Sequence, residues 1–297
     1  MIEFKNITFD DREKLLYYLN FRCNKNLCDY NFVNLFIWSE IYEAQWALSD
    51  ETLIIYNGKD DMSIMPSGCN INADRILFIS DELIKIGKSG NFALVEQNFI
   101  DKNRPALEEK FEFKEDPAFA DYIYSVDKLI NLKGKKLQKK KNLISQFVRG
   151  YPEYKTLKLE KGYFDECFNL AEKWCISKNC EKVGFSHEKS ALGKALNNYD
   201  ALELEGLTVF IENQMIAFSI FSKMNDEMYD VHFEKFSNDI KGAGQIINFE
   251  TVKYLSGKCK FVNREQDLGI EGLRQAKQSY DPELVLLTYR LTRKNNE

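Results

Sequence analysis

The residues with the clearest chemical potential lie between Phe261 and Tyr280, in the sequence FVNREQDLGIEGLRQAKQSY. A short apolar run ends there in five polar residues, Asn263, Arg264, Glu265, Gln266 and Asp267, and Gly269 follows after one leucine. Turns favour Gly, Pro, Asn, Asp and Ser for backbone reasons, and those reasons do not explain Arg, Glu and Gln. Because α/β folds bind ligands where a strand ends and a helix follows, we expect this loop to bind a substrate. A solvated loop with internal ion pairs is the alternative.

The segment after this loop has helical character and ends at Tyr280, before an Asp-Pro pair. A phenol with a pKa of about 10 is protonated at neutral pH, so Tyr280 is a candidate general acid for a leaving group. A core tyrosine with a hydrated hydroxyl is the alternative. Arg274 and Lys277 belong to the same segment, and we expect them to contact the same substrate.

A second candidate is the predicted strand Met228–Glu234. Because side chains alternate along a strand, Asp230, His232 and Glu234 are predicted to share one face. Such a stripe can supply a general base, and we expect Asp230 or His232 to serve. A half-exposed strand with a polar outer face is the alternative. The chain contains only two histidines, which excludes a multi-histidine metal centre, and we predict no bound metal.

Two further features suit an anionic ligand. Lys241, Gly242, Ala243 and Gly244 open a predicted helix, where free backbone N–H groups and the lack of side chains allow a phosphate to approach. A packing turn explains the same residues equally well. The second feature is the stretch from Lys133 to Lys141, in which six of nine residues are lysine.

On a helix, this lysine-rich stretch would form a cationic stripe through pairs four residues apart. The residues of the stripe are Lys135, Lys136, Lys139 and Lys140. We expect the stretch to bind the phosphates of a partner such as tRNA, coenzyme A or a lipid headgroup. A solvated linker helix is the alternative.

These candidates require a scaffold that brings them together. From residue 164 onward the patterns predict two helices, three antiparallel strands, a helix, a strand over residues 260–262, a helix and a last strand over residues 284–291. The N-terminal half gives a similar order with weaker signals. We therefore predict an α/β protein with mixed sheets and two similar domains, at residues 1–128 and 151–297, joined by a basic helix at 129–150.

Composition narrows the class of protein. The chain has 297 residues and is 44% hydrophobic, which suits two globular domains. A net charge of −5 argues against a protein that coats nucleic acid non-specifically, although a local basic patch remains compatible with this charge. No segment approaches the roughly 20 apolar residues of a membrane helix, and no secretory signal is evident. We therefore expect a cytoplasmic protein without a transmembrane segment.

Three segments resemble a bacterial family named after the C-terminal domain of phosphatidylglycerol lysyltransferase: LKGKKLQKKKN, KGAGQIINFE and NREQDLGIEGLRQAKQSY. The order of elements also resembles the GNAT acyltransferase fold, with its Gly-x-Gly turn and an Ala-x-x-x-Tyr helix whose tyrosine acts as an acid. The resemblance implies a tandem GNAT-like fold shared with Fem-type aminoacyltransferases. Those relatives move an aminoacyl group from charged tRNA to an amine or hydroxyl.

The resemblance implies an acyltransferase with no firmly expected cofactor. The GNAT pyrophosphate motif has Gln or Arg where this chain has Asp239, which favours a tRNA donor over acyl-coenzyme A. The acceptor is expected to be a small molecule, a peptide or a lipid headgroup. An acyl-coenzyme A-dependent N-acetyltransferase and a non-catalytic binding protein of the same fold remain the alternatives.

Overall fold

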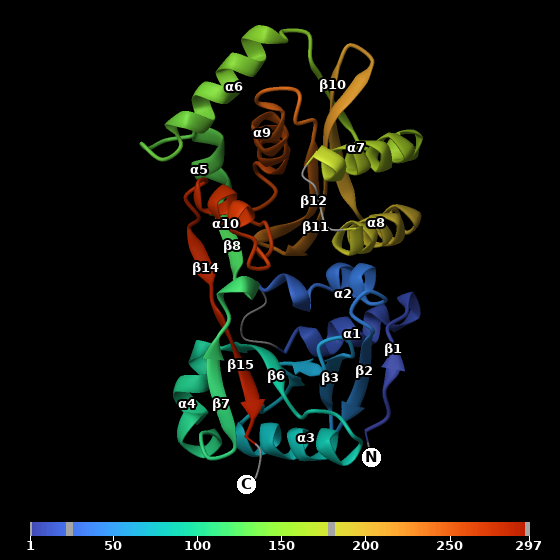
Figure 1. The fold of residues 1–297 in the computed structure, drawn as a ribbon, viewed down its shortest axis with the longest axis vertical. Coiled ribbons are helices and arrows are strands. Elements are labelled where there is room, and N and C mark those ends of the chain that lie inside the picture. The colour runs from blue at the N-terminus through green and yellow to red at the C-terminus, as the bar shows by residue number, and fades with distance from the viewer. Residues whose placement is uncertain (1, 22–25, 178–181, 295–297) are drawn as a thin grey trace. The chain divides into compact units, whose positions relative to one another are not determined.

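The computed structural model describes residues 2–21, 26–177 and 182–294 (Figure 1). The chain forms two compact units, and neither is continuous in sequence. The first unit comprises the residues up to Asp121, the segment Gln266–Ile270 and the residues from Leu286 onward. The second unit comprises Tyr122–Glu265 and Glu271–Val285.

Among its described residues, the first unit contains an eight-stranded sheet and four α-helices. Its strands are β1 (Lys5–Asn6), β2 (Ala44–Ser49), β3 (Thr52–Asn57), β4 (Met62–Ile64), β5 (Ser67–Gly68), β6 (Phe92–Glu96), β7 (Phe111–Glu115) and β15 (Thr288–Arg293). Its helices are α1 (Arg12–Leu19), α2 (Phe32–Trp38), α3 (Ala73–Lys85) and α4 (Gln97–Leu107). The strand order is β1-β2-β3-β4-β6-β15-β7, with β5 beside β3.

The second unit contains a seven-stranded sheet in the order β14-β8-β13-β12-β11-β10-β9. Its strands are β8 (Asp121–Ser125), β9 (Lys155–Lys158), β10 (Glu205–Ile211), β11 (Gln214–Asn225), β12 (Met228–Phe236), β13 (Phe261–Asn263) and β14 (Leu284–Leu286). Its helices are α5 (Val126–Asn131), α6 (Gln138–Gly150), α7 (Phe164–Ser177), α8 (Lys182–Asn197), α9 (Ala243–Leu255) and α10 (Glu271–Gln278). Strand β12 is parallel to β13 and antiparallel to β11, so the predicted mixed sheet is confirmed.

The two sheets exchange strands. Strand β8 comes from the N-terminal half and pairs with β13 in the second sheet. Strand β15, near the C-terminus, lies between β6 and β7 in the first sheet. The prediction of a single strand over residues 284–291 is therefore wrong, because β14 and β15 belong to different sheets and the exposed Leu287 separates them. The predicted domain limits at residues 128 and 151 accordingly differ from the observed units.

Helices cover both faces of the second sheet. Ser219 of β11 contacts Thr251 of α9, with 2.6 Å between the two hydroxyl oxygens. Lys235 of β12 pairs with Phe218, the residue that precedes Ser219 in β11. Lys235 also forms an ion pair with Glu188 of α8 at 2.7 Å. Because neighbouring residues of a strand face opposite sides, α9 and α8 pack on opposite faces. We call these the α9 face and the α8 face.

The main core of the second unit lies on the α9 face. Helix α9 is apolar around most of its surface, which is typical of a helix that is buried on several sides. It packs against β10, β11 and β12 and against α5 and α6, in a core that includes Val231 and Val262. Across the parts of the chain that the structure describes, every helix is too short or too polar to cross a membrane.

Candidate functional site

A β-bulge in β12 divides the predicted polar stripe. Phe233 pairs with Ile220 and Val231 pairs with Phe221, so His232 is an extra residue without a cross-strand partner. A bulge shifts the alternation of the side chains that follow it. Asp230 lies opposite Ser222, whereas Glu234 lies opposite Ser219, three positions away and therefore on the other face.

The prediction that Asp230, His232 and Glu234 share one face is therefore wrong for Glu234. Glu234 lies on the α9 face, with Ser219, and Asp230 lies on the α8 face. The polar residues form two clusters instead of one stripe. Both clusters border the part of β12 after Asp230, where pairing with β13 has ended in the described structure.

The first cluster, the histidine cluster, comprises Ser222, Asp230, His232 and Glu265. The Ser222 Oγ lies 2.8 Å from Nε2 of His232. On the other side of the ring, Nδ1 lies 3.2 Å from Oε1 of Glu265 and 3.8 Å from Oδ2 of Asp230. The imidazole thus connects a hydroxyl on β11 with a carboxylate in the loop after β13.

Burial differs sharply within the histidine cluster. The side chains of His232 and Asp230 are 0% exposed, whereas that of Glu265 is 19% exposed. Burial lowers the pKa of His232, against the opposing effect of the Asp230 charge, and this favours the neutral ring. A neutral ring protonated on Nδ1 donates to Glu265 and accepts a hydrogen bond from Ser222. Glu265 is therefore the member that solvent and substrates can reach.

The same cluster contains a possible set of metal ligands. One ligand atom from each of Asp230, His232 and Glu265 lies within 4.8 Å of the others. Two carboxylates and an imidazole can hold a divalent cation. The expected absence of a metal stays a prediction.

The second cluster, the tyrosine cluster, lies on the α9 face and comprises Tyr124, Lys140, Glu234, Arg264 and Tyr280. Nη2 of Arg264 donates to Oε1 of Glu234 at 2.6 Å. The Arg264 guanidinium carbon lies 5.1 Å from the centre of the Tyr280 ring, and Nζ of Lys140 lies 4.1 Å from it. Tyr124 meets the Tyr280 ring edge to face, at 6.5 Å between ring centres. Two cations therefore lie within cation–π range of one buried aromatic ring, which is a favourable arrangement.

The tyrosine cluster shifts the pKa values of its own members. Burial raises the pKa of Tyr280 above the ordinary tyrosine value, although the nearby Arg264 charge and a hydrogen bond with Gln245 oppose the shift. Burial, followed by the charges of Arg264 and Lys139, lowers the pKa of Lys140 to about 8. The Tyr280 hydroxyl is thus a weaker acid than a tyrosine in water, and its role as general acid stays a prediction.

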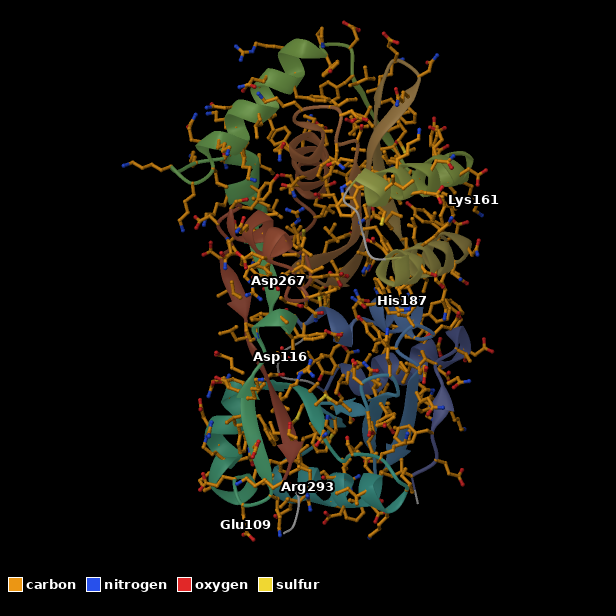
Figure 2. The ribbon with its side chains drawn as sticks, in the orientation of Figure 1. Glu109, Asp116, Lys161, His187, Asp267 and Arg293 are labelled. Atoms are coloured by element: carbon orange, nitrogen blue, oxygen red, sulfur yellow. The ribbon has the colours of Figure 1, made fainter. Side chains whose placement is uncertain are left out.

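The residues of the predicted substrate loop do not form one site, because they belong to the two clusters and to the first unit. Asn263 is fully buried, and its Oδ1 accepts the backbone N–H of Glu265 at 2.6 Å. Gln266 and Asp267, the latter labelled in Figure 2, belong to the first unit. Gln266 donates to Asp29, and Asp267 accepts the N–H of Gly269. Of the predicted loop residues, Arg264 therefore belongs to the tyrosine cluster and Glu265 to the histidine cluster.

Helix α10 places its two predicted substrate residues differently. Lys277 is buried, and its Nζ donates to the backbone oxygens of Arg264 and Glu265. Lys277 thus holds the loop between the two clusters in place. Arg274 is half-buried in the same helix.

The lysine-rich stretch is only partly helical. Helix α6 begins at Gln138, and Leu132 and Gly134 before it have left-handed backbone angles, with φ of 48° and 105°. The predicted continuous helical stripe is therefore wrong, because Lys135 and Lys136 lie in a turn. Lys136 forms an ion pair with Asp281 at 2.7 Å, while Lys135 and Lys139 are exposed. Among the four predicted lysines, Lys140 is the one that contacts Tyr280.

The glycine turn before α9 is closely packed. A Cβ atom on Gly242 would lie 3.0 Å from Cβ of Phe147, and one on Gly244 would lie 2.8 Å from the ring of Phe236. Gly242 also has a φ of 92°, which a residue with a side chain rarely adopts. Packing therefore explains both glycines without a ligand. Lys241 at the start of the turn is exposed, and Ala243 is buried.

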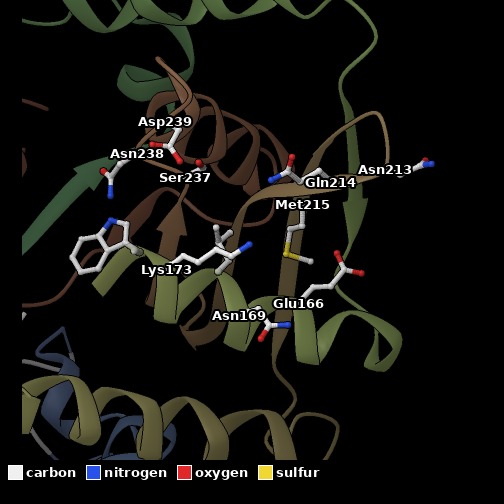
Figure 3. Close-up of a pocket in the computed structure, with 11 residues that line it drawn as sticks. Glu166, Asn169, Lys173, Asn213, Gln214, Met215, Ser237, Asn238 and Asp239 are labelled. Atoms are coloured by element: carbon white, nitrogen blue, oxygen red, sulfur yellow. The ribbon is translucent and has the colours of Figure 1, made fainter. Parts of the chain in front are cut away.

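A cavity of about 470 Å³ lies between α7, the turn joining β10 to β11 and the loop after β12 (Figure 3). Lys173, Glu166 and Asp239 contribute charged groups to its lining. None of the predicted site residues lines it. The sequence did not indicate Ser222 or Tyr124, which only the pairing of distant segments brings into the two clusters.

Two mixed sheets in tandem, with a polar site where β12 separates from β13, define an acyltransferase fold of the GNAT type. The chain belongs to the family described as "Phosphatidylglycerol lysyltransferase, C-terminal", whose model matches residues 21–292. The sequence-based identification of the family is thereby confirmed. The family and the fold point to an acyltransferase of the aminoacyl or GNAT type.

Solved structures support this assignment. A conserved protein of unknown function from Bacteroides thetaiotaomicron is 34% identical, with a TM-score of 0.90 over 99% of this chain and 100% of its own. L-PGS from Bacillus licheniformis is 15% identical, with a TM-score of 0.62 over 97% of this chain and 93% of its own. A tandem GNAT protein from the clavulanic acid pathway is 9% identical, with a TM-score of 0.51 over the whole of both chains. The last two show the fold alone.

One curated relative also matches part of the sequence. An uncharacterized protein of Mycoplasmoides gallisepticum is 23% identical over 174 residues, or 57% of this chain. The match covers 54% of that protein, so the chain spans about half the length of the curated relative it matches.

Proposed function

We propose that the protein transfers an aminoacyl group from charged tRNA to an amine or hydroxyl acceptor. The family description names a lysyltransferase, which is an enzyme that moves an aminoacyl group. The acceptor would be a small molecule, a peptide or a lipid headgroup, with phosphatidylglycerol suggested by the family description. Because charged tRNA is a cytoplasmic donor, we also propose a cytoplasmic location.

The observation that carries this proposal is the position of Lys140. Its ammonium group lies over the Tyr280 ring, beside the guanidinium of Arg264. The lysine-rich stretch thus has one end in the tyrosine cluster, while Lys135 and Lys139 are exposed to a large anionic partner. A polyanionic donor bound along this stretch would bring its acyl end to the edge of β12.

The glycine turn favours tRNA over coenzyme A as the donor. In a coenzyme A site, the glycines would leave room for a pyrophosphate at the start of the helix. Here the side chains of Phe147 and Phe236 occupy the positions next to Gly242 and Gly244. Asp239, three residues before Gly242, adds a negative charge that a pyrophosphate would meet.

The test is a transfer assay with bulk tRNA charged with radiolabelled amino acids. Vesicles containing phosphatidylglycerol and a peptide with a free amine serve as separate acceptors. We expect the purified protein to move label to one of them, and acetyl-coenzyme A to leave the melting midpoint unchanged. Binding of tRNA without transfer to either acceptor would indicate a non-catalytic binding protein instead.

The contribution of Lys140 can be isolated with a matched pair of variants. Lys140→Gln removes the charge in the tyrosine cluster, and Arg149→Gln removes a charge from the exposed end of the same helix. We expect only Lys140→Gln to weaken tRNA binding and to reduce the salt slope by about one. Equal effects of the two variants would show that tRNA binding depends on the overall charge of the helix and not on Lys140 in particular.

A further inference from the structure

We propose that Glu265 is the general base of the transfer reaction and that Ser222 and His232 position its carboxylate. This inference rests on the proposed function. It assigns the proton-accepting role to a residue that the sequence indicated only as a substrate contact. It also moves Asp230 and His232, the bases expected from the sequence, into supporting positions.

Accessibility separates Glu265 from the other members of the histidine cluster. A general base must come within hydrogen-bond reach of the proton that it removes. The side chains of His232 and Asp230 have no exposed surface, so an acceptor cannot reach them in this conformation. The carboxylate of Glu265 is partly exposed and lies 3.2 Å from Nδ1 of His232. Ser222, His232 and Glu265 are thus linked by hydrogen bonds, and Glu265 is the member that a substrate can contact.

The backbone of Glu265 is held from three directions. Its N–H donates to Oδ1 of the buried Asn263 at 2.6 Å. Its carbonyl oxygen accepts from Nζ of Lys277 at 3.0 Å and from the N–H of Tyr122 at 3.4 Å. The residue also has a φ of 55°, a left-handed conformation that is uncommon outside glycine and that surrounding contacts must maintain. A catalytic carboxylate benefits from such fixed placement.

The remaining hydrogen bonds fix the direction of the carboxylate. Nδ1 of the buried His232 lies 3.2 Å from Oε1 of Glu265, so an N–H on Nδ1 donates to that carboxylate. An ionised carboxylate can only accept, so Glu265 selects the tautomer protonated on Nδ1, and the hydroxyl of Ser222 on the neighbouring strand then donates to Nε2. Ser222 and His232 thus act through Glu265 and are positioning residues.

In the proposed reaction, Glu265 first accepts one proton and later returns it. Glu265 takes a proton from the acceptor nitrogen or oxygen as that atom forms a bond to the aminoacyl carbonyl carbon. The ester bond to the tRNA ribose then breaks, and the protonated Glu265 returns the proton to the leaving ribose oxygen. The products are an amide or ester and uncharged tRNA, and Glu265 ends as a carboxylate.

The test compares Glu265→Gln and Glu265→Ala with the wild type in the transfer assay. We expect both variants to lose a factor of about 10²–10⁴ in kcat while tRNA affinity stays unchanged. Formate should restore part of the activity of Glu265→Ala, with sodium chloride at equal ionic strength as the control. A small carboxylate in the vacated space can accept the proton, and it cannot repair a merely structural loss.

The positioning residues have a test of their own. His232→Gln should lower kcat, and adding it to Glu265→Ala should cause no further loss, because His232 acts through Glu265. A further loss in the double variant would overturn the positioning role. Wild-type turnover by Glu265→Gln would overturn the base assignment alone. A wild-type protein that transfers no label to any acceptor would overturn the proposed function and this assignment with it.

Discussion

Arg264 and Glu234 form an ion pair that is mostly shielded from water, with 2.6 Å between Nη2 and Oε1. Their side chains are 15% and 11% exposed. Removing one partner of a buried pair leaves an uncompensated charge and typically costs about 3–5 kcal/mol of folding free energy. We therefore expect Arg264→Met to destabilise the protein by about that amount in urea unfolding.

The double variant Arg264→Met/Glu234→Leu should be less destabilised than the single variant, because both charges are then gone. Additive losses in this double-mutant cycle would contradict the coupling of the two residues.

The packed glycine turn gives a second prediction. Gly244→Ala would place a methyl group 2.8 Å from a ring carbon of Phe236, and we expect a loss of about 1–3 kcal/mol from overpacking. Gly272→Ala in α10 is the matched control, because a Cβ there meets no atom within 4 Å. Chemical unfolding of both variants measures the difference. Equal stability of the two would show that the turn has free space for a ligand after all.

Asp29 predicts a pH dependence of stability. Burial and the charge of Asp121 raise the pKa of Asp29 from 3.8 to about 7, against hydrogen bonds from Gln266 and Cys28. Between these two values the folded state keeps a proton that the unfolded state has released. The free energy of unfolding therefore falls as the pH rises from about 4 to about 7.

Asp29→Asn should remove this part of the pH dependence, and urea unfolding at several pH values measures it. An unchanged slope in the variant would assign the effect to other groups.

Tyr280→Phe tests whether Tyr280 or Glu265 donates the proton to the leaving oxygen. The sequence assigned Tyr280 the role of general acid, which would make the loss in kcat about 10²–10⁴. Burial raises the pKa of its hydroxyl, and Glu265 can return the proton itself, so we expect a loss below about tenfold. Single-turnover transfer rates decide between them. A loss of several hundredfold would restore Tyr280 as the acid.

Much of the second unit was predictable from sequence because its elements have strong local signals. The alternation in β10–β12, the apolar helix α9 and the loop after β13 are all visible in the residue pattern. The most specific part of the family resemblance, from Asn263 to Tyr280, includes this loop. Strand β9, with its exposed polar residues, carried no such signal, and neither did the short helix α5.

The arrangement of the site was less predictable because it depends on backbone irregularities. The alternation rule placed Glu234 beside His232, but one inserted residue at the bulge sends it to the other face. The lysine pattern suggested one helix, but Leu132 and Gly134 adopt left-handed angles before it starts. The role of Ser222 depends on cross-strand pairing with Asp230, which residue types alone do not reveal.

The exchange of β8 and β15 between the sheets affects which recombinations between related genes would keep each sheet intact. Neither sheet is encoded by an uninterrupted stretch, since each takes a strand from the opposite half of the chain. A crossover between two related genes near the middle would give each sheet one strand of foreign origin. The halves are therefore expected to be inherited together, although their order of elements suggests two separable modules.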